Sequence, residues 1–291
     1  MAKANLLSRL EKAKSIRSRQ VFCPVANLRA IVSPLTVNDD LSLKSMVSSP
    51  DLYDKDLAIL LYNHTEFPDI QGEKPNFDQF IETISDFDKK SILWGIYDAT
   101  YRTLGKTNIT CPKCKNKWET EIFSKDLLNE DTIKGQWDKE EPFNDYYIKM
   151  DIPIGLEDLL KFTFNISVPS IKKHLDVLKL INVDEMKDNF NRFNSILSKP
   201  EELCLITKSI SIYGETEDEP EETIINTFEI HSIIKNYITL DVVNDVIDLF
   251  DKEFSIYNPI FKKELNCKSC GHVFSFPVDI EVALFRSFLR L

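Results

Sequence analysis

The sequence predicts an α+β fold that is mainly helical and carries two cysteine-bearing β-hairpins in a degenerate internal duplication. Apolar residues recur at helical spacing in both halves of the chain, and the strand-like runs are short. Two Cys-x-x-Cys turns, Cys111–Cys114 and Cys267–Cys270, each lie between strand-like runs. With 291 residues, 43% of them hydrophobic, the chain can bury one large core or two modest cores.

Residues 1–22 are predicted to form a basic amphipathic arm. Their net charge is +5, whereas the whole chain carries −11, so the remaining residues sum to −16. Apolar residues recur at helical spacing over residues 4–18, and a helix this short needs a partner surface to be stable. The candidate partner-binding residues are Leu6, Leu10, Ala13 and Arg17. A frayed terminus, an arm folded back on the acidic body, and weak contact with anionic lipid are the alternatives.

Residues 23–140 are predicted to form a helical half that ends in the first knuckle. A strand-like stretch covers residues 25–37, and capping residues with apolar spacing then predict four helices. These helices begin near Asn38, Ser49, Phe77 and Asp86. Gly105 stands where a glycine would terminate the last helix. Strands over residues 108–110 and 118–122 would frame the knuckle.

Residues 141–291 are predicted to form the second half, with a β-hairpin insertion over residues 203–230. Two β-like runs, 205–213 and 224–230, are joined in this insertion by an acidic tip, which is most simply a solvated loop. The other predicted elements are a strand over 146–154 and helices over 171–178, 186–197 and 239–254. The second knuckle follows the last of these helices.

The two halves share a spacing that indicates the internal duplication. Asp88 and Asp98 each follow an apolar or aromatic residue and stand ten residues apart, as do Asp241 and Asp251. Asp88 precedes the first knuckle by 23 residues and Asp241 precedes the second by 26, a difference that one loop can absorb. The predicted plan is therefore helix, loop, strand, knuckle and strand, twice over. Convergence on a common helix-plus-knuckle pattern is the alternative.

The two Cys-x-x-Cys turns point to one structural Zn²⁺ site. Its expected ligands are Cys111, Cys114, Cys267 and Cys270. Each turn places two thiolates on one side of a tight bend, which is half of a tetrahedral site. Four protein thiolates leave no coordination position open for catalysis, so the expected role of the zinc is structural. Disulfides, a redox dithiol and a metal-free pair of hairpins are the alternatives.

The remaining cysteines and the knuckle histidine are expected to have ordinary structural roles. Cys23 and Cys204 have no metal-binding context and are predicted to be small buried side chains. His272, inside the second knuckle, is predicted to be a turn residue and not a ligand. Because no secretory apolar segment follows the basic start, the paired knuckles suggest a reducing compartment, where thiols bind metal.

No catalytic motif stands out, and the chain is expected not to be an enzyme. Its seven glycines do not form a dinucleotide-binding or phosphate-binding loop. Its four histidines form no His-Glu-x-x-His motif, and there is no Gly-x-Ser-x-Gly elbow. No apolar run reaches the ~20 residues that cross a bilayer, so no membrane span is expected.

Several residues of the first half occur in a recognisable order. They are Pro34-Leu35-Thr36-Val37, Phe87-Asp88, Arg102, Gly105 and then Cys111. Over roughly residues 28–125 this order resembles the baseplate hub proteins of T-even-like contractile-tailed bacteriophages, although Tyr101 replaces the leucine expected before Arg102. The resemblance implies a non-enzymatic structural or assembly component of the tail baseplate hub. It also implies other hub and tail proteins as partners, with the tape-measure protein a further candidate, and a place in the virion after assembly in the host cytoplasm.

The main alternative is a zinc-ribbon nucleic-acid-binding or transcription-associated factor. Lysines on and beside the knuckles favour it. These are Lys113, Lys115, Lys117, Lys262, Lys263 and Lys268. The acidic body argues against it, because negative charge repels the phosphate backbone. Nucleic acid is therefore not the expected partner.

Overall fold

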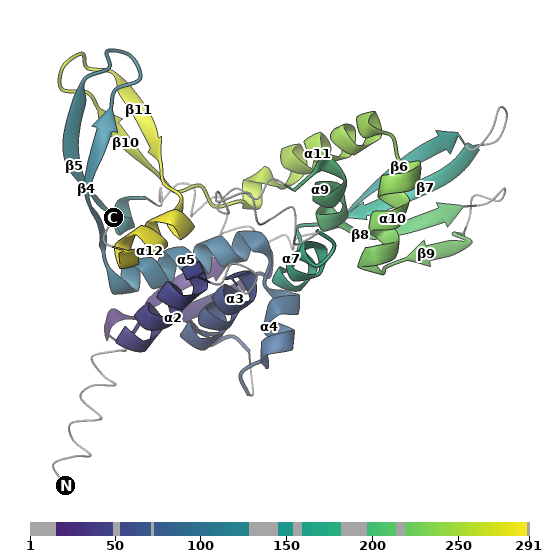
Figure 1. Cartoon of the computed structure of the whole chain (residues 1–291), viewed down its shortest axis with the longest axis horizontal. Coiled ribbons are helices and arrows are strands. Elements are labelled where there is room, and N and C mark those ends of the chain that lie inside the picture. The colour runs from purple at the N-terminus through teal and green to yellow at the C-terminus, as the bar shows by residue number, and fades with distance from the viewer. Residues whose placement is uncertain are drawn as a thin grey trace, which may run out of the picture. The chain divides into compact units, whose positions relative to one another are not determined.

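The computed structural model describes residues 16–48, 53–70, 73–127, 145–153, 159–181, 197–213 and 219–289 (Figure 1). The chain divides into two compact units. The first contains Met1–Phe77, Phe87–Glu141 and Pro259–Leu291, and the second contains Asp78–Asp86 and Pro142–Asn258. The C-terminal hairpin thus belongs to the unit of the first knuckle and not to that of residues 142–258.

The first unit combines a small antiparallel sheet, helices and two β-hairpins. Its strands are β1 (Arg19–Cys23), β2 (Leu28–Val32), β3 (Thr65–Glu66), β4 (Thr103–Thr110), β5 (Lys117–Phe123), β10 (Lys262–Asn266) and β11 (Val273–Pro277). Its helices are α2 (Val37–Ser48), α3 (Tyr53–His64), almost all of α5 (Asp86–Thr100), α12 (Ile280–Leu289) and the 3-10 turn η2 (Ser124–Asp126). Strands β1, β2 and β3 pair in that order, whereas β4–β5 and β10–β11 are separate two-stranded sheets.

Helix α5 forms the centre of this unit because it packs closely on strands β1 and β2. A Cβ atom added to Gly95 would lie 2.7 Å from Val32 Cγ2 and closer still to Val21 Cγ1. Only glycine therefore permits this approach between helix and sheet. Both valines are fully buried, as are Ile92 and Tyr97 of the same helix.

Two buried aspartates of α5 hold neighbouring segments in place. Asp88 accepts hydrogen bonds from the backbone amides of Val25 (2.9 Å) and Ala26 (3.2 Å), in the turn between β1 and β2. Asp98 is bonded by the Arg19 guanidinium and by the Ser124 hydroxyl. Each of these buried carboxylates is thus hydrogen-bonded to groups that are distant in the sequence, as a buried charge requires.

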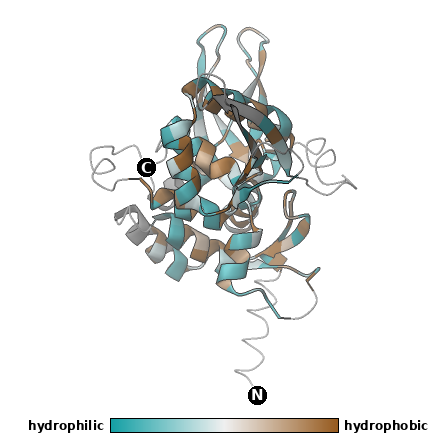
Figure 2. Ribbon diagram, turned by 90° about the vertical axis from the view of Figure 1, so that its right-hand side faces the viewer, coloured by the Kyte–Doolittle hydropathy of each residue, from teal (hydrophilic) through white to brown (hydrophobic). Residues whose placement is uncertain are grey.

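The second unit is a four-stranded antiparallel sheet with helices packed on one face. Its strands pair in the order β6 (Tyr146–Pro153), β7 (Leu159–Ile166), β8 (Thr207–Tyr213) and β9 (Glu222–Ile224). Its helices are α4 (Phe77–Thr83), α7 (Ile171–Leu178), α9 (Lys199–Ile206), α10 (Thr227–Tyr237), α11 (Leu240–Phe254) and the 3-10 turn η4 (Ser255–Tyr257). Phe164, Ile166 and Ile210 are fully buried on the face where α9 and α10 contact β8. The helices carry both polar and apolar residues, as expected for helices that bury one face (Figure 2).

The prediction of a mainly helical fold is wrong. Among the described residues, helix accounts for 45% and strand for 28%, and these strands form four antiparallel sheets, so the fold is mixed. Strand β7 is one of the strands that were not predicted. Its alternation of Lys161, Thr163 and Asn165 with apolar residues is a strand signal that the helical interpretation overlooked.

Two boundaries in the predicted insertion also differ from the structure. The β-like run 205–213 begins in α9, and only its residues from Thr207 onward form strand β8. The run 224–230 leaves the sheet after Ile224, because the Asn226 side chain accepts hydrogen bonds from the amides of Phe228 and Glu229 and caps α10. Local capping therefore outweighs the β propensity of the isoleucines.

The predicted order of helix, strand, knuckle and strand occurs twice, because the 15-residue helices α5 (Asp86–Thr100) and α11 (Leu240–Phe254) each precede a knuckle hairpin. The surroundings of the two helices differ. Asp88 and Asp98 are buried, whereas Asp241 and Asp251 lie exposed on α11. A three-stranded sheet opens one unit and a four-stranded sheet the other. The repeated order is therefore present, whereas the burial of the aspartates and the sheets of the two units are not shared.

Some predictions fall beyond the described part of the chain. The helix over 186–197 lies there, and so do Leu6, Leu10 and Ala13 of the arm, while Arg17 is described and exposed. Among the helices that are described, none combines the length and apolar character needed to cross a membrane.

Candidate metal centre

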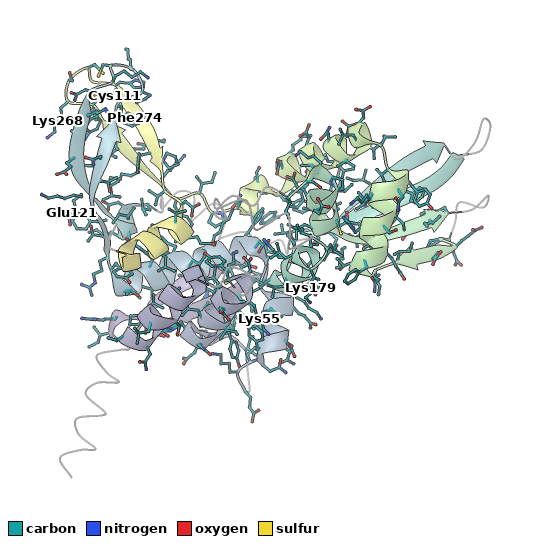
Figure 3. The ribbon with its side chains drawn as sticks, in the orientation of Figure 1. Lys55, Cys111, Glu121, Lys179, Lys268 and Phe274 are labelled. Carbon is teal, nitrogen blue, oxygen red and sulfur yellow. The ribbon has the colours of Figure 1, made fainter. Side chains whose placement is uncertain are left out.

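The four knuckle cysteines lie together at the end of the two hairpins in the first unit. Their Sγ atoms are all within 4.8 Å of one another. Across the hairpins, Cys111 Sγ lies 3.8 Å from Cys270 Sγ, and Cys114 Sγ lies 3.6 Å from Cys267 Sγ. Figure 3 shows Cys111 near the hairpin tips. The first cysteine of one knuckle thus faces the second cysteine of the other.

Both knuckles use the same backbone turn. The amide of Cys111 donates to the Asn116 carbonyl (2.9 Å), and the amide of Cys267 donates to the His272 carbonyl (2.9 Å). A second bond runs from the amide four residues after each first cysteine back to that cysteine's carbonyl. That residue has a positive φ in both turns, 61° at Lys115 and 68° at Gly271. The two turns are therefore matched in geometry as well as in sequence.

Backbone amides inside each turn favour the thiolate of the first cysteine. Burial raises the pKa of Cys267, but hydrogen bonds from the amides of Cys270 and Ser269 have the larger opposite effect. The resulting pKa is about 7, below the ordinary value of 9.0. The pKa of Cys111 is lowered against burial in the same way, by the amides of Cys114 and Lys113. Amide groups converging on one sulfur act as a small anion-binding nest.

The second cysteine of the first knuckle has the opposite tendency. The Asn116 amide lowers the pKa of Cys114, but contacts with the neighbouring thiols, Cys270 first, together with burial, raise it to about 12. Four anionic sulfurs this close repel one another, so they can all ionise only around a cation. The cluster could therefore hold a metal ion through four thiolates.

Packing around the cluster shields one side of it. Cys111 and Cys267 are fully buried, whereas Cys114 and Cys270 are exposed. Trp118 and Phe274, one from each hairpin, meet edge to face with 6.1 Å between ring centroids. His272 stacks on Phe274 at 6.0 Å and lies in the turn, as predicted for a residue that is not a ligand.

A second set of contacts joins the hairpins at their base. The Lys262 amide donates to the Leu127 carbonyl (3.0 Å), and Lys263 Nζ lies 2.9 Å from Asp126 Oδ2. Trp94 of α5 stacks on the buried Phe261 with 6.4 Å between centroids. Because β4–β5 and β10–β11 share no strand pairing, they are connected by the cysteine cluster, by the ring contact of Trp118 with Phe274 and by the contacts at this base.

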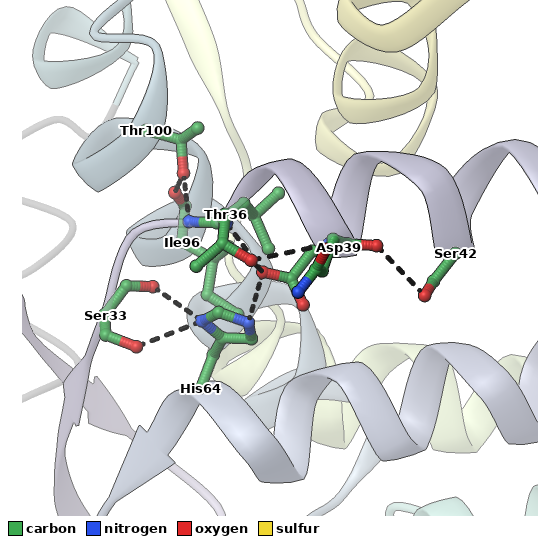
Figure 4. Close-up of polar contacts among 9 residues, drawn as sticks. Ser33, Thr36, Asp39, Ser42, His64, Ile96 and Thr100 are labelled. Atoms are coloured by element: carbon green, nitrogen blue, oxygen red, sulfur yellow. Dashed lines mark hydrogen bonds and ion pairs between the residues drawn. The ribbon is translucent and has the colours of Figure 1, made fainter.

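Sequence reasoning missed a polar cluster at the start of α2 (Figure 4). His64 Nδ1 lies 3.0 Å from Ser33 Oγ and 3.2 Å from the Ser33 carbonyl, and His64 Nε2 lies 3.2 Å from Asp39 Oδ2. The same Asp39 oxygen accepts from the amide and hydroxyl of Thr36. Thr36-x-x-Asp39 is thus a helix-capping box, a pattern that the sequence already displays.

This cluster has the residue types of a Ser-His-Asp triad, but its contacts hold two helices together. His64 is 7% exposed, and Ser33 offers its ring both a carbonyl and a hydroxyl. Asp39 already accepts hydrogen bonds from the amide and hydroxyl of Thr36, the residue before α2. The contacts therefore fasten the end of α3 to the start of α2.

Four residues of the predicted family pattern have structural explanations. Thr36 caps α2, and Asp88 holds the β1–β2 turn. Gly105 does not terminate α5, which ends at Thr100. Arg102 takes the left-handed conformation there (φ 61°), and Gly105 (φ 72°) occupies a bulge of β4.

Comparisons of this chain with protein families, with curated proteins and with solved structures find no match in any of the three.

Cys23 and Cys204, predicted to be buried, are both fully buried and lie apart from the cysteine cluster.

Proposed function

We propose that this chain is a non-enzymatic structural or assembly subunit whose hairpin pair is fixed by one zinc ion. The reciprocal sulfur distances of 3.8 and 3.6 Å carry this proposal. A tetrahedron with zinc–sulfur bonds of about 2.3 Å has edges of about 3.8 Å. Two of the six Sγ–Sγ distances thus match the edges of a tetrahedral site, and the other four are at most 4.8 Å.

Zinc is the proposed metal because its filled d shell accepts a tetrahedral four-sulfur site without redox chemistry. A single iron ion also suits four thiolates. The two metals differ in absorption, because an iron–thiolate centre is coloured and a zinc centre is not. Metal analysis and a visible spectrum therefore separate them.

The proposed role of the ion is structural for two reasons. Four thiolates fill the coordination sphere, so no position remains for a substrate or water. A two-stranded hairpin is at best marginally stable by itself, and neither hairpin pairs with the other. One ion joining residues 159 positions apart would stabilise both hairpins at once.

We further propose that the subunit acts in the tail baseplate hub of a contractile-tailed phage. The order of Thr36, Asp88, Arg102 and Gly105 supports it, because this order resembles that of the hub proteins. The proposed partners are other hub and tail proteins, with the tape-measure protein a further candidate. The proposed location is the virion, after assembly in the host cytoplasm. Mass spectrometry of purified tails should detect this chain, and its absence from tails and from tail-assembly intermediates would contradict the proposal.

Metal content tests the zinc centre. Protein purified without added chelator should contain one zinc per chain, and Cys267→Ser/Cys270→Ser should contain none. Cys23→Ala/Cys204→Ala removes the same number of thiols outside the cluster and should keep its zinc. Unsubstituted protein free of zinc and iron would contradict the proposed centre.

A further inference from the structure

The hairpin ends carry more positive charge than is needed to balance the proposed metal site. We call this surface the knuckle tip, and define it as four exposed lysines on the two turns: Lys113, Lys115, Lys117 and Lys268. Neither turn, 111–117 or 267–272, contains an acidic residue. Within the described part of the chain none of the four lysines forms an ion pair, whereas Lys263 at the hairpin base is paired with Asp126.

Charge balance at the tip leaves a surplus. One Zn²⁺ and four thiolates together carry −2. Four lysines therefore leave the tip at +2, within a chain whose net charge is −11. Because the lysines contribute +4, all other residues sum to −15. The tip is thus a local positive pole on an acidic protein.

The cysteine cluster creates this pole by bringing two distant turns together. Three of the lysines belong to the first turn and Lys268 to the second, and Figure 3 shows Lys268 beside the labelled Cys111. Val273, next to the second turn, is 58% exposed and adds an apolar contact. A partner that touches all of these residues requires both hairpins to be in place.

We propose that the knuckle tip is a docking surface for a carboxylate-rich segment of a partner protein. This inference rests on the proposed zinc centre, which holds the two turns together. Opposite charge accelerates encounter and fixes orientation. A tip of this kind would suit a subunit that must find acidic neighbours during assembly.

The distribution of acidic residues favours a protein segment over nucleic acid. Exposed glutamates lie on the hairpin strands, between the tip and the base: Glu119, Glu121 and Glu264. Figure 3 shows Glu121 in this position. A nucleic-acid strand has phosphates along its whole length, so it would meet these carboxylates once it extended past the tip. A short acidic segment can end where the lysines end.

The test uses the whole zinc-loaded chain and two charge-matched probes. The first is a labelled peptide with the sequence of residues 215–222, Glu-Thr-Glu-Asp-Glu-Pro-Glu-Glu, which carries six carboxylates. The second is a single-stranded oligothymidylate with the same number of negative charges. Fluorescence anisotropy at low salt gives a Kd for each probe, and zinc content is measured on every sample first.

Two lysine variants separate local from overall charge. The tip variant replaces Lys113, Lys115, Lys117 and Lys268 with Gln. The control variant replaces four exposed lysines elsewhere with Gln: Lys55, Lys179, Lys208 and Lys252. Both variants have the same net charge. The tip variant should bind the peptide at least ~10-fold more weakly, and the control variant should bind within about twofold of the unsubstituted chain.

Zinc dependence completes the test. Cys267→Ser/Cys270→Ser should lose peptide binding as the tip variant does, because Lys268 is no longer held beside the first turn. Tighter binding of the oligothymidylate would overturn the proposal in favour of a nucleic-acid surface. Equal loss in both lysine variants, or no peptide binding by zinc-loaded protein, would also overturn it while leaving the zinc centre intact. A chain without metal would instead count against the centre itself.

Discussion

Trp118 lies edge to face against Phe274, with 6.1 Å between their ring centroids, and each ring stands seven residues after the first cysteine of its own knuckle. The two rings thus link the hairpins next to the cysteine cluster, in the same relation to each turn. They provide a contact between hairpins that does not depend on a metal ion.

Removing this ring contact should weaken zinc binding without abolishing it. Phe274→Ala is expected to cost about 1 kcal/mol, the order of a single aromatic pair. Zinc transfer to a chelator should then be several-fold faster than in the unsubstituted chain. Val273→Ala changes an exposed neighbour on the same strand and should leave the rate unchanged. Equal rates for both variants would mean that the rings do not support the centre.

The two equivalent turn positions should respond to substitution in opposite directions. Gly271 has φ 68°, so Gly271→Ala is expected to destabilise the second hairpin by about 1 kcal/mol. Lys115 has φ 61° with a side chain, so Lys115→Gly should relieve strain and be neutral or stabilising. Chelator concentration at half-loss of zinc measures both effects. A shift of the same sign in both variants would contradict the matched geometry.

Gly95→Ala tests the packing of α5 on its sheet. The new methyl group would overlap Val21 and Val32, so we expect a loss of about 1–3 kcal/mol in the free energy of unfolding despite the better helix propensity of alanine. Denaturant midpoints measure the loss. Asp245→Ala, on the exposed face of α11, serves as a helical control and should change stability by less than about 0.5 kcal/mol.

The capping box at α2 should make stability depend on acidity. Burial raises the pKa of Asp39, but the Thr36 hydroxyl and amide and the nearby His64 lower it below its ordinary value of 3.8. A lowered folded-state pKa contributes stability above the unfolded value, and this contribution is lost as pH falls through the folded value.

Asp39→Asn should therefore cost about 1 kcal/mol at neutral pH, the usual size of a capping contribution. The difference in unfolding free energy from the unsubstituted chain should shrink as pH is lowered below about 4. Denaturant titrations at several pH values measure this trend. A difference that grows on acidification would contradict the assigned role of Asp39.

The parts of this structure that were predicted from sequence depend on local patterns. A Cys-x-x-Cys turn specifies its own geometry within a few residues, so both knuckles and their flanking strands were identifiable. Helix α7 was identifiable because Ile171, Leu175 and Leu178 recur at helical spacing, with Ile171 buried and the two leucines partly buried.

The parts that were missed depend on partners far away in the chain. Asp88 has the sequence context of a helix cap, yet it accepts hydrogen bonds from residues 62 and 63 positions earlier. Asp241 has a similar context and remains exposed. No local pattern distinguishes these two aspartates, because the difference arises only when β1 and β2 pack against α5. The attachment of the C-terminal hairpin to the first unit through Asp126 and Lys263 was equally hidden.

The most direct test of the central claim is X-ray absorption at the zinc edge of the purified chain. Tetrahedral coordination by both knuckles predicts four sulfur neighbours at about 2.3 Å and no lighter first-shell ligand. Cys267→Ser/Cys270→Ser should lose this signal. A first shell with fewer than four sulfurs, or with nitrogen or oxygen ligands in their place, would contradict a zinc ion that joins the two hairpins.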